Sequence, residues 1–440
     1  MSRRDDIFGS FIKYNDETED RVKNGIEQNR KGFVTITLKD KNGNPIVGKK
    51  IKITQKKHEF LHGANLFMLD ELETEEKNNK YKELFRQTFN EATLPFYWCD
   101  LEPTEGNLRF KKDSPKIYRR PAPDLCLEYC DKYGITPKAH CLTYFNVQPD
   151  WVDGTDICDM KLKLEKRYRQ LAERYAGKIN GWEVINELFC AWEPWIKNPF
   201  FVSDEVLDWN FKLAEKYFPC NELIVNEASQ IWELGHFAYA RSGYYQMIKH
   251  GIERGLRIDA VGMQYHIFND MENEKYNTRD KYNPKVLFDV LDTYEKLGKP
   301  IQITEVTIPA YTDTAEDEKI QAELIERLYG IWFSHKAVEA IIYWNLVDGY
   351  AAFAPQGDMT SGENKFRGGL LRFDMSKKPA YEMMYHLFNE RWVTKTEAET
   401  NENGCAKFKG FYGTYEIDAD GKKFNVSVKS NIKNDIELQL

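Results

Sequence analysis

Three carboxylates end short apolar runs in the middle of the chain: Glu187, Glu227 and Glu305. A carboxylate at the end of an apolar strand is costly unless it is paired or used. Two carboxylates that face one pocket can cleave a glycosidic bond. One donates a proton to the leaving oxygen, and the other attacks the anomeric carbon or activates a water that does so. Three such residues favour a functional site over chance.

Eight apolar runs alternate with helical patterns between about residues 58 and 390. They lie at 60–67, 89–98, 136–145, 179–187, 221–227, 258–268, 300–306 and 339–346. A helix is predicted over 161–176 from the apolar spacing of Leu162, Tyr168, Leu171 and Tyr175. Eight such repeats predict an α/β fold, a (β/α)8 TIM barrel. The structural competitor is a doubly wound open sheet, but no glycine-rich phosphate loop follows the first strand.

Active sites of TIM barrels lie at the carboxyl ends of the strands. The fourth run ends in Asn186-Glu187 and the seventh in Glu305, so these glutamates lie roughly across the barrel from each other. The sixth run carries Gln264 and His266, and the eighth carries Trp344. The sequence does not give the separation of the two carboxylates, which decides between retention and inversion.

Several segments resemble glycoside hydrolase family 10, the xylanase family, in the family's order. WEVINELF at 182–189 resembles the acid/base signature, and ITEVTI at 303–308 resembles the nucleophile motif. GMQYH at 262–266, HCLTYFNVQPDW at 140–151 and GLLRFDMSKKPAY at 369–381 are similar to further family motifs. The resemblance covers about residues 60 to 390, and motifs in register are far more specific than any one of them.

The resemblance implies a retaining enzyme. Glu305 would be the nucleophile and Glu187 the acid/base, while Asn186 would bind the 2-hydroxyl of the reacting sugar. His266 would orient Glu305. Gln264 and His140 would line the same sugar site, and Trp344 would stack on the glycone. No metal or organic cofactor is implied.

The sequence departs from the family where sugar hydroxyls are bound. After Thr93 the family reads E-N-x-M-K-W, whereas this chain has Leu94 to Trp98 and lacks the three polar groups. W-H-S-Q becomes 144–147, Tyr-Phe-Asn-Val. Ala352 replaces a loop tryptophan, and Thr307 replaces the aspartate two places after the nucleophile. Each lost polar contact weakens binding by about 0.5–1.5 kcal/mol.

Aromatic residues stand in the altered motifs, and we expect them to rebuild the glycone pocket. They are Tyr97, Tyr144, Phe145 and Phe353. The predicted function is retaining hydrolysis of β-1,4-glycosidic bonds in xylan or xylo-oligosaccharides. One alternative is a retaining β-glycosidase acting on a non-xylan or decorated substrate. A second, less favoured, is a non-catalytic carbohydrate-binding protein, which would have no use for the paired Glu187 and Glu305.

The two ends of the chain are rich in predicted strands. Residues 1–30 are polar, and predict a helical or loose arm. Residues 32–55 alternate apolar and polar positions around Asn-Gly-Asn-Pro, which predicts a β-hairpin. A turn at 418–421 separates two further runs near the C-terminus. We therefore expect an N-terminal arm and accessory strands over 1–57, a catalytic barrel over 58–390, and C-terminal accessory strands over 391–440, with both ends forming one small β-sandwich.

Composition excludes several partners. A net charge of −8 argues against nucleic acid and against an anionic membrane surface. No apolar run of membrane-spanning length and no secretory signal is recognised. Eight scattered cysteines without a CxxC pair are typical of free thiols in a reducing cytoplasm, so cytoplasmic localisation is expected, or secretion if a signal has been removed. The expected partner is a β-linked oligosaccharide or polysaccharide.

Overall fold

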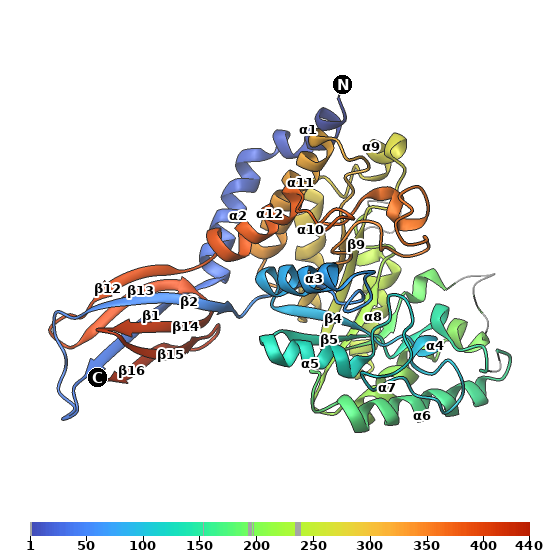
Figure 1. The fold of residues 1–440 in the computed structure, drawn as a ribbon, viewed down its shortest axis with the longest axis horizontal. Coiled ribbons are helices and arrows are strands. Elements are labelled where there is room, and N and C mark those ends of the chain that lie inside the picture. The colour runs from blue at the N-terminus through green and yellow to red at the C-terminus, as the bar shows by residue number, and fades with distance from the viewer. Residues whose placement is uncertain (1, 153, 192–195, 197, 234–238) are drawn as a thin grey trace.

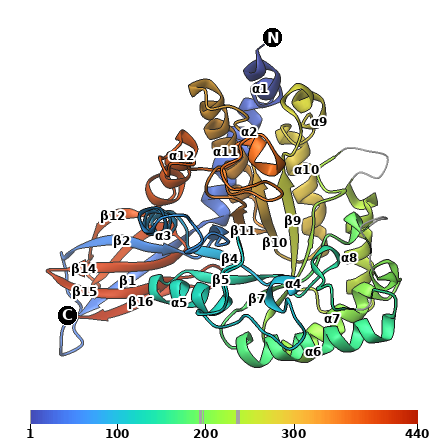
Figure 2. The ribbon, with the colours of Figure 1, turned by 45° about the vertical axis from the view of Figure 1, so that its right-hand side comes forward.

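A computed structural model describes residues 2–152, 154–191, 196, 198–233 and 239–440. Figure 1 shows a large α/β body with a smaller β-rich body beside it, to which both ends of the chain contribute. The larger body is a closed parallel barrel (Figure 2), which confirms the predicted fold class.

The barrel strands follow the eight predicted apolar runs. They are β3 Leu61–Asn65, β4 Glu91–Pro95, β5 Thr136–His140, β6 Thr143–Tyr144, β7 Gly181–Asn186, β8 Glu222–Glu227, β9 Ala260–His266, β10 Ile301–Thr307 and β11 Val338–Tyr343. The order β5-β4-β3-β11-β10-β9-β8-β7-β6 closes because β5 also pairs with β7. The predicted run 136–145 is therefore two short strands. Every residue of β7 and β10 is buried, as parallel strands covered on both faces require.

Helices connect successive strands and cover the barrel. The longer ones are α3 Glu75–Thr88, α5 Pro123–Tyr133, α6 Ile157–Tyr175, α7 Val206–Tyr217, α8 Gly243–Glu253, α10 Pro284–Tyr294, α11 Ala315–Ser334 and α12 Pro379–His386. Shorter pieces are α4 Trp98–Leu101, α9 Glu274–Asn277, η1 Phe145–Val147, η2 Leu188–Cys190, η3 Pro199–Val202, η4 Tyr239–Arg241, η5 Met271–Asn273, η6 Glu295–Leu297, η7 Gly362–Phe366 and η8 Leu387–Arg391.

The structure corrects the predicted apolar stripe of α6. Leu162 is 69% exposed. The buried stripe instead runs through Met160, Leu164, Tyr168, Leu171 and Tyr175, at spacings of three and four. The Asp156 carboxylate accepts the backbone N–H groups of Cys158 and Asp159, and so fixes where this helix begins.

The accessory strands form two small sheets that share one core. They are β1 Lys31–Lys39, β2 Lys50–His58, β12 Lys395–Glu399, β13 Cys405–Phe411, β14 Gly413–Ala419, β15 Lys422–Val428 and β16 Asn434–Gln439. One sheet has the order β13-β1-β16 and the other β12-β2-β14-β15. Both ends of the chain are needed for each sheet, so the predicted sandwich from both termini is confirmed.

The predicted hairpin over 32–55 is wrong. β1 and β2 lie in different sheets, and a single bridge between Lys39 and Pro45 is all that pairs the two sides of the turn. Val34 and Ile36 of β1 pack across the shared core with Ile51 and Ile53 of β2. An alternating apolar pattern is expected both for two strands of one hairpin and for two strands in facing sheets, so it did not distinguish them. The strands that pair with β1 and β2 come from the C-terminal part of the chain.

Two N-terminal helices join the bodies. α1 Arg3–Lys13 buries Ile7, Phe8 and Phe11. α2 Asn15–Asn29 lies along α11 and leads to β1 (Figure 1), and a Cβ on Gly25 would meet the Ser334 carbonyl oxygen at 2.6 Å. The arm is therefore helical and packed. Within the described residues, no helix is both long and apolar enough to cross a membrane.

Candidate active site

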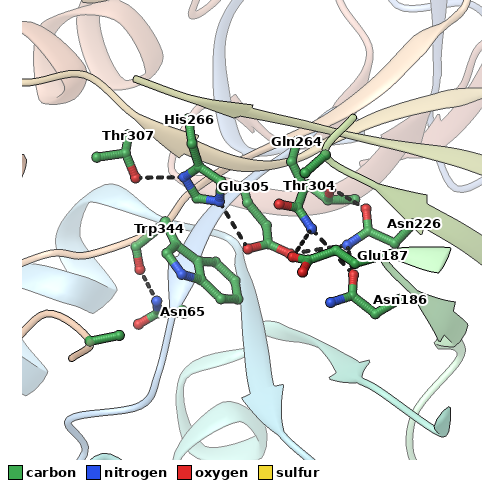
Figure 3. A network of polar contacts seen from close by, with 12 residues as sticks. Asn65, Asn186, Glu187, Asn226, Gln264, His266, Thr304, Glu305, Thr307 and Trp344 are labelled. Carbon is green, nitrogen blue, oxygen red and sulfur yellow. Dashed lines mark hydrogen bonds and ion pairs between the residues drawn. The ribbon is translucent and has the colours of Figure 1, made fainter. Parts of the chain in front are cut away.

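Both predicted carboxylates lie at the carboxyl-terminal mouth of the barrel, as Figure 3 shows. Glu187 follows β7 directly, with a φ of 56°, a left-handed conformation that is uncommon for a residue with a side chain. Its backbone N–H donates to the Asn226 carbonyl at 3.0 Å. Glu305 lies within β10 and is only 3% exposed, whereas Glu187 is partly buried.

Glu305 is held by two hydrogen-bond donors. Asn226 Nδ2 donates to Oε1 at 3.0 Å, and His266 Nε2 lies 3.2 Å from Oε2. Burial raises the pKa of Glu305, and the nearby Glu187 raises it further, while His140 and the bond from Asn226 act in the opposite direction. Donors of this kind stabilise the ionised carboxylate that a nucleophile requires.

The His266 ring is neutral, and its two contacts show which nitrogen carries the proton. Burial lowers the pKa of His266 to about 4, so the ring is neutral near pH 7. Nδ1 lies 2.9 Å from Thr307 Oγ1, which can donate to it. A neutral ring that accepts at Nδ1 carries its proton on Nε2 and donates that proton to Glu305. The ionised Glu305 carboxylate only accepts, so it selects this tautomer, and Thr307, known from sequence only as a departure from the family, complements it at Nδ1.

Glu187 also receives two bonds. The Tyr144 hydroxyl donates to Oε2 at 2.6 Å, and Gln264 Nε2 donates to Oε1 at 2.9 Å. Burial raises the pKa of Tyr144, and the Glu187 carboxylate raises it further. Tyr144 therefore stays a neutral donor. The structure thus brings together the predicted residues Tyr144, Gln264 and Glu187.

Asn226 connects the two carboxylates, although no role was predicted for it. Its amide nitrogen lies 2.8 Å from Asn186 Oδ1 as well as 3.0 Å from Glu305, and its own oxygen accepts from Thr304 at 2.5 Å. Asn186 Oδ1 also accepts from Gln264 at 3.2 Å. Because its oxygen is used in this way, Asn186 has its amide N–H groups to offer to a substrate hydroxyl. The signal was present: Asn226 directly precedes Glu227, the last residue of the fifth apolar run.

A chain of buried charges lies below His140. Its Nδ1 hydrogen-bonds Glu183, and its Nε2 lies 3.0 Å from the Tyr97 hydroxyl. Lys138 Nζ lies 2.9 Å from the other Glu183 oxygen. Burial acts to raise the pKa of Glu183, but Lys138 and His140 outweigh it and lower that pKa to about 2. Burial acts to lower the pKa of His140, but Glu183 outweighs it and raises that pKa. Sequence reasoning missed Glu183 and Lys138, which are charged residues inside apolar strands.

Aromatic rings form the wall beside His140. Phe67, Tyr97 and Trp344 pack as one cluster, with the rings of Phe67 and Trp344 5.2 Å apart. Trp344 also lies edge-on to His140 at 5.3 Å. The structure therefore brings the predicted residues Tyr97 and Trp344 together beside His140. Phe67 was not recognised, because it follows its strand without a polar neighbour to mark it.

The other two aromatic residues of the altered motifs differ in exposure. Phe145 is 5% exposed and belongs to the main core, with its ring centre 5.1 Å from that of Tyr144. Phe353 is 82% exposed. Its neighbour Ala352 has a backbone N–H that donates to Glu363 at 3.2 Å.

The third strand-end carboxylate supports the backbone. Glu227 accepts the backbone N–H groups of Phe189, Ala228 and Ser229 at 2.8 to 3.0 Å. Burial raises its pKa to about 7. Phe189 lies two residues after Glu187, so Glu227 holds the turn that carries that side chain.

Two clusters bring carboxylates and a histidine within metal-binding distance of one another: His140–Glu183–Glu305 and Asp292–Glu295–His335. In the first, Lys138 already supplies the cation for Glu183. In the second, Arg21 and Lys336 pair with the two acids, at 2.5 and 2.7 Å. We assign no metal to either cluster.

The amino-acid sequence is similar to those of several known proteins. The chain resembles anti-sigma-I factor RsgI6 of Acetivibrio thermocellus, with 24% identity over 94% of this chain and 48% of the relative. It resembles endo-1,4-beta-xylanase 2 of Arabidopsis thaliana, with 22% identity over 88% and 32%, and endo-1,4-beta-xylanase B of Thermotoga neapolitana, with 25% over 76% and 88%. The chain thus spans half or less of the first two relatives.

The fold is that of a solved xylanase. Native xylanase 10B from Thermotoga maritima superposes with a TM-score of 0.59 at 22% identity, covering 76% of this chain and 96% of that one. A closed barrel with two glutamates at the ends of β7 and β10 has the architecture of a barrel glycoside hydrolase. The model of glycosyl hydrolase family 10 matches residues 58–386, well over half of the chain, and the chain belongs to that family.

Proposed function

We propose that this protein hydrolyses β-1,4-glycosidic bonds in xylan or xylo-oligosaccharides, with retention of anomeric configuration. The observation that carries the proposal is the pairing of Glu187 and Glu305 across the mouth, linked through Gln264, Asn186 and Asn226. Membership of family 10 and relatives named as xylanases support the substrate.

We infer a separate role for each glutamate. Glu305 attacks the anomeric carbon and forms a covalent glycosyl-enzyme, while the glycosidic oxygen leaves with the proton of Glu187. Glu187 then takes a proton from water, which attacks the same carbon and releases Glu305. Asn186 donates to the 2-hydroxyl, a bond that strengthens in the transition state. Tyr144 and Gln264 position Glu187 through both steps.

A second candidate is retaining hydrolysis of a decorated or non-xylan β-glycan. Tyr97 favours it, because its ring lies in the segment where the family has polar groups. It packs with Phe67 and Trp344 in one aromatic cluster. A non-catalytic sugar-binding protein is the third candidate, and the relative named as an anti-sigma factor makes it worth testing. Binding alone gives no reason to retain two carboxylates with separate sets of donors.

The deciding experiment is hydrolysis of a substrate panel by the wild type, Glu187→Ala and Glu305→Ala. The panel contains xylan, xylo-oligosaccharides with and without side groups, β-glucans and aryl β-glycosides. Proton NMR of the first product fixes the anomer, and the β-anomer is expected. Thermal melting of each variant controls for folding. An initial α-anomer, or hydrolysis that survives Glu305→Ala, would remove the mechanism.

Domain limits and location also remain proposals. We infer accessory units at 1–57 and 391–440 around a catalytic unit at 58–390, in keeping with the sheets that both ends form. We infer a cytoplasmic site of action, because all eight cysteines are unpaired, as a reducing compartment keeps them.

A further inference from the structure

An arginine near the aromatic wall is buried without being satisfied. Arg119 lies in the loop of residues 102–122 that follows α4, has a φ of 63° and is 6% exposed. Its Nη1 donates to Asn345 Oδ1 at 3.3 Å and to the Tyr350 carbonyl. Its Nε is buried without a hydrogen-bond partner among the described residues. A guanidinium offers five N–H donors, so most of its capacity is unused.

The charge of Arg119 is also uncompensated at short range. Among the residues that the structure describes, no carboxylate lies within 4.0 Å of it. The Glu363 carboxylate acts on the pKa of Arg119, but it already accepts from Ala352 and Asn345. Burial, and then the neighbouring Arg120, lower the pKa of Arg119. A buried cation without a paired anion is costly, which points to an anion that arrives with the ligand.

Arg120 provides a contrast in the same loop. Its Nε lies 2.8 Å from Asp100 Oδ2, and its guanidinium lies 4.3 Å from the centre of the Tyr97 ring. Arg120 is therefore paired and stacked, and it has no need of a further anion. The two adjacent arginines differ in that only Arg119 lacks a partner.

Arg119 lies next to the residues that contact the sugar in the proposed function. Asn345, which accepts its hydrogen bond, follows Trp344 in the chain. Its guanidinium lies 6.0 Å from the centre of the Phe67 ring, which packs on Trp344. Tyr350, whose carbonyl it binds, is two residues before Ala352, where the family has a bulky tryptophan. Charge and space therefore occur together at the glycone end.

We propose that Arg119 binds the carboxylate of an acidic sugar unit, a uronic acid, held beside the glycone on Trp344. The planar guanidinium matches a carboxylate with two parallel hydrogen bonds, which a hydroxyl cannot make. The inference rests on the proposed function and narrows its substrate to an acidic glycan.

The test compares a β-1,4-xylo-oligosaccharide that carries one uronic acid with the same compound after reduction of the carboxyl group to a neutral alcohol. The pair differs in charge while keeping almost the same shape. The readout is the ratio of kcat/KM for the acidic over the neutral compound. A ratio of 10 or more is expected for the wild type, and Arg119→Gln should bring it to about 1. Arg119→Lys keeps the charge without the fork and should give an intermediate ratio.

Arg109→Gln is the matched control. Arg109 is 3% exposed in the same loop, and its guanidinium binds the carbonyls of Pro115, Asp100 and Arg120. Its replacement disturbs the loop without touching Arg119, so the ratio should stay at the wild-type value. A wild-type ratio near 1, or a ratio that Arg119→Gln leaves unchanged, would overturn the proposal.

Affinity separates this inference from the proposed function. Calorimetric binding of both compounds to Glu305→Gln, with and without Arg119→Gln, needs no turnover. Hydrolysis of both compounds without a charge preference would refute the role of Arg119 alone. Tight, Arg119-dependent binding of the acidic compound to a wild type that cleaves neither would refute the hydrolase and leave the subsite standing.

Discussion

The polar network around Glu305 and the aromatic wall of Phe67, Tyr97 and Trp344 occupy one mouth of the barrel but are built differently. Around Glu305, the polar groups bind one another: Asn226 and His266 contact the carboxylate, and Thr307 contacts the second nitrogen of His266. Around Trp344, aromatic rings pack together and Arg119 keeps unused donors. A closed polar network preorganises a reaction, whereas an unsatisfied charge beside rings awaits a ligand. In the proposed function, the polar network serves the reaction and the aromatic wall serves recognition of the sugar.

Removal of the connecting amide should have the largest effect. Asn226→Ala takes away the donor to Glu305 and the contact that orients Asn186. We expect kcat/KM to fall about 10²-fold, in line with the loss of one preorganised donor. Because the lost bond lowers the pKa of Glu305, that pKa should rise and the acid limb of the pH–rate profile should move to higher pH. An unchanged acid limb would mean that the limb reports another group.

Truncation of the wall should act on binding instead. Trp344→Ala removes the ring that packs on Phe67 and His140. KM for the preferred oligosaccharide should rise about 10-fold, as expected for a stacking contact worth about 1–1.5 kcal/mol, with a smaller change in kcat. Steady-state kinetics check this, with circular dichroism as the folding control. A loss confined to kcat would show that Trp344 acts with the polar network around Glu305 and not in substrate binding.

A negative charge next to His266 should shift the pKa values of His266 and Glu305 without removing their contact. Thr307→Asp puts a carboxylate beside Nδ1, which should raise the low pKa of His266 and make the ring cationic. The imidazolium would lower the pKa of Glu305, so the acid limb should move to lower pH, opposite to Asn226→Ala. The pH profile of kcat/KM measures the shift, and Thr307→Ser is the conservative control. A shift to higher pH would show that the second carboxylate acts on Glu305 directly.

The smallest effect is expected at the opposite end of the barrel, where a substitution should change stability and leave activity unchanged. Gln302 there donates to Glu222 and Glu339 at 3.1 and 2.8 Å. Burial, then Glu222, raise the pKa of Glu339 to about 8. Since a raised acid pKa favours folding while protonated, stability should fall as pH rises from about 4.5 through 8.

Glu339→Gln should flatten that pH dependence without changing kcat. Urea denaturation of both proteins at pH 5.5 and 8.5 measures it. Equal slopes for the wild type and the variant would show that Glu339 keeps no proton, and a lower kcat would couple this end of the barrel to the active site.

Prediction from sequence is accurate for the barrel strands, where the signal is local. It put Glu187, Gln264, His266 and Glu305 at one mouth, where the structure has them, because buried parallel strands place their last polar residues there. It failed where partners are distant: β1 pairs with β13 and β16, nearly 400 residues away, so a hairpin was predicted instead. Arg119 carried no signal, since an arginine in a polar loop is ordinarily solvated.

The sequence alone thus determined the barrel, the family and the pair of glutamates, because repeated apolar runs and ordered motifs are properties of the chain itself. The tertiary structure decided which neighbours tune that pair. Asn226 bridges Glu305 and Asn186, Thr307 contacts the second ring nitrogen of His266, and Glu183 raises the pKa of His140. Burial and proximity set those protonation states and left Arg119 without an anion, and neither property can be measured along a chain before it folds.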